Sequence, residues 1–154
     1  YLKSRGRLRI GIFSEGVYST LPFFYNYTSS LLMAPSFQPI PENQTLFLSK
    51  FRANQYIALG LKSIIALPYK IDFRLEAYIF QPYYTILKNE LNKAKYSEPF
   101  LSRMLMGSAT AVYYSPVGPL ALAVNYYQEQ ESIKNKISVL FTFGYLLFNK
   151  RSLD

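Results

Sequence analysis

The stretch Gln55-Tyr-Ile-Ala-Leu-Gly-Leu-Lys-Ser-Ile-Ile-Ala-Leu67 alternates between aliphatic residues and residues of other kinds. Ile57, Leu59 and Leu61 occupy every second position, and Lys62 belongs to the opposite set. Because a β-strand points successive side chains to opposite faces, this pattern predicts one long strand with an aliphatic face.

The same period of two recurs along most of the chain. It predicts six strands, near residues 7–19, 55–67, 73–83, 104–114, 120–127 and 137–148. The pattern in 104–114 does not decide which residues share a face. In the other strands the clear charges lie opposite the aliphatic face. With strands as the only predicted elements, we expect an all-β, antiparallel fold. The pattern alone does not say which face points inward.

Strand length and the spacing of the connections favour a transmembrane β-barrel. The predicted strands are about 8–13 residues long, whereas globular strands are typically about 5–6 and membrane strands about 9–11. Tight turns are predicted at Pro68–Asp72 and Ser115–Pro119. They alternate with long connections at residues 20–54, 84–103 and 128–136. Short turns on one side and long loops on the other are typical of outer-membrane barrels.

The composition agrees with strands rather than helices as the membrane-crossing elements. Half of the 154 residues are hydrophobic, yet the mean hydropathy is only +0.02 and no run approaches the roughly 20 apolar residues of a spanning helix. The chain has no Cys and no His, which excludes a disulfide framework, a zinc finger and a Ser-His-Asp triad. No Gly-x-Ser-x-Gly sequence occurs. Ser14 lies two residues before Gly16, but Ile12 occupies the position of the first Gly. We therefore expect no catalytic residue, metal site or cofactor in this chain.

The net charge of +8 does not indicate nucleic-acid binding. The basic residues are spread along the chain and mostly flank apolar segments, whereas a nucleic-acid surface gathers them with exposed aromatic residues. Aromatic residues near the strand ends instead suggest girdles at the two membrane interfaces. They are Tyr83, Tyr84, Tyr113, Tyr114, Tyr126, Tyr127 and Phe148.

Three local motifs carry a resemblance to a known family. The turn formed by Ser115, Pro116, Gly118 and Pro119 resembles a late turn in the barrels of the BamA/TamA-like outer-membrane assembly superfamily. Lys50-Phe-Arg-Ala-Asn54 is similar to the arginine motif of that superfamily's sixth extracellular loop, with Ala53 in place of the usual Gly. The C-terminal stretch resembles the signal by which barrels are recognised for insertion, through Thr142, Gly144, Tyr145 and Phe148.

The resemblance implies that residues 1–154 are the six C-terminal strands of a larger, sixteen-stranded barrel in the bacterial outer membrane. The amino-acid sequence of residues 35–82 most resembles the barrel appended to bacterial patatin-like phospholipases. Any catalytic or periplasmic domain is therefore expected upstream of residue 1. The implied partners are outer-membrane lipid, the barrel-assembly machinery and the remaining strands of the barrel.

The resemblance also implies a role for Arg52. In that superfamily the loop arginine points into the lumen and pairs with a strand carboxylate, and Glu76 is the best-placed partner in this sequence. Arg74 competes for the same carboxylate, so an Arg74–Glu76 pair with a solvated Arg52 is the alternative.

The expected function is outer-membrane anchoring, with a translocating or presenting role for the upstream domain. The alternative is a soluble β-barrel that binds an apolar ligand, in which the aliphatic faces would point inward.

Overall fold

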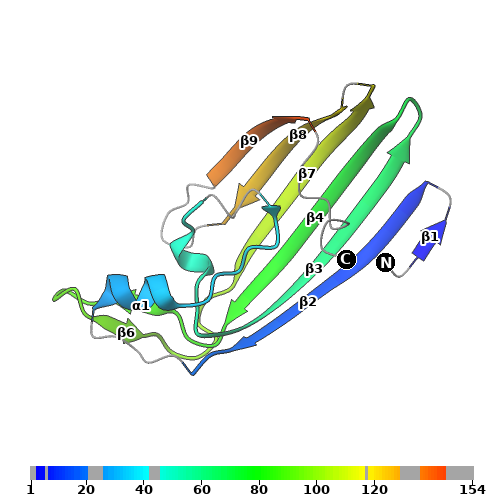
Figure 1. The fold of residues 1–154 in the computed structure, drawn as a ribbon. Helices are drawn as coiled ribbons and strands as arrows, with labels where there is room; N and C mark the ends of the chain where they lie inside the picture. The colour runs from blue at the N-terminus through cyan, green and yellow to red at the C-terminus, as the bar shows by residue number, and fades with distance from the viewer. Residues whose placement is uncertain are drawn as a thin grey trace, which may run out of the picture.

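The computed structural model describes residues 3–5, 7–20, 26–41, 46–116, 118–128 and 136–144. Seven strands form one antiparallel sheet, which has the strand order β1-β2-β3-β4-β7-β8-β9 (Figure 1). These strands are β1 (Lys3–Arg5), β2 (Leu8–Tyr18), β3 (Gln55–Leu67), β4 (Ile71–Pro82), β7 (Met104–Ser115), β8 (Gly118–Tyr127) and β9 (Lys136–Phe143). The all-β class is confirmed. In the part of the chain described here the sheet stays open, with β1 at one edge and β9 at the other.

All six predicted strands are present, with small shifts at their ends. The strand at 55–67 is found with the predicted bounds, and β4 begins two residues earlier than expected, at Ile71. Strand β9 ends at Phe143, and the rest of the predicted strand, 145–148, lies outside the described residues. The three-residue β1 was not predicted, because a segment so short shows too little alternation to be recognised.

The strand register places the short and the long connections at opposite ends of the sheet. Leu67 pairs with Ile71, and Ser115 pairs with Gly118, so both tight turns lie at the same end. Tyr18 pairs with Gln55 at the other end, where the long segments after β2, β4 and β8 leave the sheet. We call these the turn end and the loop end.

Two of the long connections contain structure that the sequence analysis did not predict. The segment between β2 and β3 holds the helix α1 (Tyr27–Met33) and the 3₁₀ turn η2 (Ser49–Phe51). The segment between β4 and β7 forms a small hairpin of β5 (Ile86–Lys88) and β6 (Ala94–Tyr96). Of the helices in the described ranges, none is long and apolar enough to cross a membrane.

The start and end of α1 follow from its flanking residues. The Asn26 side chain accepts a hydrogen bond of 2.9 Å from the Thr28 amide, which satisfies one of the free N–H groups at the helix start. Pro35 follows the last residues of the helix and disfavours helical backbone at Ala34, which is extended. The carbonyl groups of the last turn therefore need donors from elsewhere in the chain.

The two faces of the sheet are in very different surroundings. The segment comprising residues 26–41 and 46–54 is here called the inserted segment. Its residues Phe37, Ile40, Leu48 and Phe51 pack against one face of the sheet, which we call the covered face, while its helix α1 packs against the β5–β6 hairpin. On the opposite face, which we call the bare face, large aliphatic and aromatic side chains are exposed. They include Leu8, Ile12, Ile57, Leu59, Leu61, Leu67, Leu75, Ile79, Leu105, Tyr113, Leu122, Val124, Ile137, Val139, Phe141 and Phe143.

Candidate functional site

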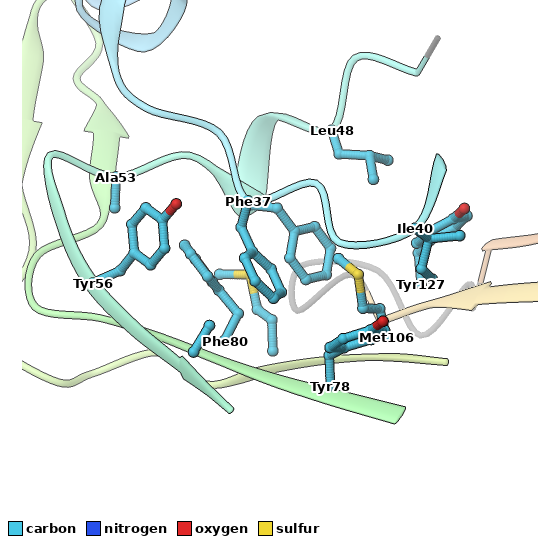
Figure 2. Close-up of a cluster of buried hydrophobic side chains, with 12 residues drawn as sticks. Phe37, Ile40, Leu48, Ala53, Tyr56, Tyr78, Phe80, Met106 and Tyr127 are labelled. Atoms are coloured by element: carbon cyan, nitrogen blue, oxygen red, sulfur yellow. The ribbon is translucent and has the colours of Figure 1, made fainter. Parts of the chain in front are cut away.

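The covered face is held against the inserted segment by aromatic side chains at the loop end of the sheet. Phe37 and Phe51 of the inserted segment are both almost completely buried. The ring of Phe37 stacks on Phe80 of β4, with 5.4 Å between the centroids, and Tyr56 of β3 packs against both rings, at 4.8 Å from Phe80 and 6.0 Å from Phe37. Figure 2 shows Phe37 and Ile40 reaching from the inserted segment toward Tyr78, Phe80 and Tyr127 of the strands.

Backbone hydrogen bonds also join the two parts of the inserted segment. The Phe37 amide donates to the Phe51 carbonyl at 2.8 Å, and the Ala53 amide donates to the Pro35 carbonyl at 3.2 Å. The chain on the way into the segment and the chain on the way out therefore lie side by side. This pairing places Phe37 and Phe51 together over the sheet.

The Arg52 side chain binds the end of α1, and it makes no hydrogen bond to the described residues of the sheet. Its Nη1 donates to the carbonyl oxygens of Leu32 at 3.0 Å, Ala34 at 3.2 Å and Leu31 at 3.4 Å. Its guanidinium also lies 4.9 Å from the centre of the Phe47 ring. These carbonyls belong to the end of α1, where intrahelical donors are lacking, so Arg52 supplies the missing partners.

Glu76 makes its contacts on the covered face, where the alternation places it, but with partners other than the predicted ones. Its carboxylate lies 3.7 Å from Lys62 Nζ on the adjacent strand and accepts a hydrogen bond from the Tyr78 hydroxyl. A second carboxylate, Glu15, accepts a hydrogen bond of 2.5 Å from the Tyr56 hydroxyl. Each carboxylate thus has a tyrosine donor, which offsets the cost of removing it from water.

Arg74 is engaged at the turn end of the covered face. Its Nη2 donates to the Tyr114 hydroxyl at 3.2 Å, and that hydroxyl donates to Asp72 at 3.0 Å. Among the described residues, neither the Arg52–Glu76 pair nor the alternative Arg74–Glu76 pair is formed. Both expectations are corrected, because the end of α1 and the Tyr114–Asp72 pair take up the two guanidinium groups.

The predicted turn between β7 and β8 is tight, as expected. Ser115 pairs with Gly118, and the Ser115 hydroxyl donates to the Gly118 carbonyl at 2.5 Å. Gly118 has a φ of 138°, a conformation that side chains disfavour, and Pro119 continues into β8. Pro116 occupies the turn itself and is exposed.

The C-terminal motif is described in part. Thr142 lies in β9 opposite Ala121, and the Gly144 amide donates to the Pro119 carbonyl at 3.1 Å. Gly144 adopts a φ of 107°. Tyr145 and Phe148 lie outside the described residues.

The predicted aromatic girdle is only partly found. Tyr113 and Tyr126 belong to the bare face, but Tyr127 is completely buried on the covered face and Tyr114 bonds within it. The prediction is wrong for these two residues, because adjacent tyrosines on a strand must point to opposite faces. Tyr83 and Tyr84 instead join a ring cluster at the loop end with Phe100 and Tyr96. A hydrogen bond with Tyr83 raises the pKa of the Tyr84 hydroxyl above its ordinary value.

The bare face is aliphatic in every long strand of the sheet. Leu59 is 54% exposed and Phe141 is 66% exposed, although both lie in the middle of regular strands. A shallow groove of about 660 Å³ runs across this face, between walls that include Leu59, Ile79 and Leu105. The described sheet thus exposes apolar side chains on its bare face, whereas Glu15, Glu76 and the buried Tyr56, Tyr78 and Tyr127 lie on the covered face. Soluble domains usually show the reverse.

Sequence reasoning missed the residues that attach the inserted segment, Phe37 and Phe51. A signal for them exists, because this long connection contains apolar residues that a solvated loop would not need, including Leu31, Ile40 and Phe47. Their spacing follows neither the strand nor the helix period, so the pattern did not predict where they pack.

Comparison with known proteins gives no relative for this chain. No family model, no curated protein and no solved structure matches it. Within the described residues, no group of three or more acidic, His or Cys side chains is arranged to hold a metal ion.

Proposed function

We propose that this chain forms the C-terminal strands of a larger antiparallel β-barrel in the bacterial outer membrane and anchors an upstream domain there. The observation that carries the proposal is the bare face. Its aliphatic side chains are contiguous across strands β2, β3, β4, β7, β8 and β9, whereas soluble monomers seldom expose apolar patches larger than a few hundred Å². Lipid is the solvent in which such a surface is stable.

The covered face supports the same proposal. A barrel lumen accommodates ion pairs and hydrogen-bonded tyrosines, and Lys62, Glu76 and Arg74 are bonded in this way on the face opposite the aliphatic one. The inserted segment then fills part of the lumen, and Arg52 holds that segment in shape by binding the end of α1.

The open edges of the sheet support a larger barrel. Backbone groups left unpaired in lipid cost several kcal/mol each, so β1 and β9 require further strands from the same barrel. Tight turns at one end and long segments at the other match the periplasmic and extracellular sides of such barrels. The resemblance of the motifs favours the BamA/TamA-like superfamily, with a patatin-like phospholipase as the upstream domain. It also makes the C-terminal motif the part that the assembly machinery recognises.

Membrane fractionation tests this proposal. The full-length protein, with the further strands that β1 and β9 require, is expressed in a Gram-negative host. It should sediment with the outer membrane, resist an alkaline carbonate wash and require detergent for release. Recovery in the aqueous fraction without detergent would overturn the proposal and favour the alternative, a soluble barrel that binds an apolar ligand.

A further inference from the structure

The groove on the bare face ends near a positively charged side chain. Two small residues, Ala77 of β4 and Gly107 of β7, face each other across the strand pair and form the floor of the groove. Ile79 and Leu105, the next pair toward the loop end on the same face, form part of its walls. Two residues further along, Gln81 and Arg103 continue the two strands at the edge of the apolar surface.

Arg103 is fixed in place by Gln81. Arg103 Nε donates to Gln81 Oε1 at 3.1 Å, while Gln81 Nε2 donates to the Ser102 carbonyl at 2.8 Å. The side-chain oxygen of Gln81 therefore orients the guanidinium by accepting a hydrogen bond from the Nε of Arg103. The Nη groups of Arg103 form no hydrogen bond or ion pair with any described residue, and the side chain is exposed.

Among the described residues around Arg103, no carboxylate is paired with its guanidinium. The residues at the loop end of the bare face are Tyr18, Gln55, Gln81, Tyr126 and Gln128, and none of these described positions is a carboxylate. Glu98 lies earlier in the same connection, and within the described residues it makes no ion pair with Arg103.

We propose that this groove and Arg103 together bind one anionic lipid, with the headgroup phosphate on the free Nη groups and an acyl chain along Ala77 and Gly107. This inference rests on the proposed function, because it assigns a ligand to the surface that the proposal places in lipid. Residues 103 and 107 are about 13 Å apart along an extended strand, at about 3.3 Å per residue. An acyl chain that extends about 13 Å from the headgroup comes close to the centre of a hydrocarbon core about 30 Å thick. The groove volume of about 660 Å³ falls within the range of small-molecule sites, roughly 300–1,000 Å³.

Lipid retention measured by native mass spectrometry tests the site. The full chain is purified in detergent and exchanged with equal amounts of phosphatidylglycerol and phosphatidylcholine that carry the same acyl chains. We expect preferential retention of one phosphatidylglycerol molecule. Arg103→Gln should lower the ratio of anionic to zwitterionic lipid about fivefold, the factor that corresponds to about 1 kcal/mol per basic residue near a membrane surface.

Two further variants separate the headgroup from the acyl chain. Lys70→Gln removes a cation at the opposite, turn end and should leave the ratio unchanged. Gly107→Val fills the floor of the groove and should lower retention of both lipids without changing their ratio. A Cβ on residue 107 meets only the Glu76 carbonyl, at 3.4 Å, which is an ordinary van der Waals contact.

The outcomes distinguish this inference from the proposed function. Equal retention of phosphatidylglycerol by Arg103→Gln and the unchanged chain would overturn the lipid site, even if the protein fractionates with membranes. If the chain is recovered without detergent and retains no lipid, the proposed function fails and the lipid site fails with it.

Discussion

Tyr78 of β4 lies directly across Gly60 of β3, and its ring fills the space that a side chain on residue 60 would occupy. A Cβ built on Gly60 would come within 2.3 Å of the Tyr78 ring. The same ring packs edge-on against Phe13 at 5.6 Å, and its hydroxyl donates to Glu76. Gly60 therefore lets Tyr78 connect the aromatic cluster to the ion pair of Lys62 and Glu76.

Gly60→Ala should destabilise the fold, because Tyr78 must move and lose part of its packing and its hydrogen bond. We expect a loss of roughly 1–3 kcal/mol, the usual cost of overpacking a core. Urea titration followed by circular dichroism measures it. Gly107→Ala in β7 is the matched control, since a Cβ there makes only an ordinary contact. Equal stability of the two variants would contradict the role assigned to Gly60.

Arg52 and Glu76 should not be energetically coupled. A double-mutant cycle with Arg52→Met and Glu76→Gln should give a coupling free energy within about 0.3–0.5 kcal/mol of zero, as for residues without shared partners. The cycle of Lys62→Met with Glu76→Gln should give about 0.2–1 kcal/mol, since this ion pair is only partly buried. A larger coupling in the first cycle than in the second would restore the loop-arginine pairing predicted from the sequence.

Phe37 should contribute most to holding the inserted segment against the sheet. Phe37→Ala removes a completely buried ring that contacts Tyr56, Tyr78 and Phe80, and should cost roughly 3–5 kcal/mol or release the segment. Limited proteolysis of residues 26–54 detects the release. Leu32→Ala, at an exposed position of the same segment, should change stability by no more than about 0.5 kcal/mol. Indistinguishable proteolysis of the two variants would argue against this attachment.

The alternation in the sequence predicted the sheet because each long strand has a strongly aliphatic face. Ile57, Leu59 and Leu61 alternate so clearly that the exposed residues of this stretch are those the pattern places together. Strand β7 was ambiguous because both of its faces are apolar, with Met104 and Met106 on the covered side and Leu105 on the bare side.

The partners of the charged residues could not be predicted from the same pattern. Arg52 bonds to α1, a seven-residue helix without an acidic residue in its first turn, and so short a helix shows little helical pattern in the sequence. Arg74 and Glu76 share a face, as the alternation predicts, but their actual partners, Tyr114 and Lys62, lie on neighbouring strands. Those contacts depend on the register between neighbouring strands, and the alternation within one strand does not predict that register.

The central claim is that the bare face contacts lipid and the covered face does not. Leu61 and Lys62 are adjacent in β3, lie at the same depth and point to opposite faces. The chain contains no Cys, so Leu61→Cys and Lys62→Cys each carry a single fluorescent label. In vesicles that contain brominated lipid, the label at 61 should be strongly quenched and the label at 62 only weakly. Equal quenching at the two positions, or stronger quenching at 62, would contradict the account.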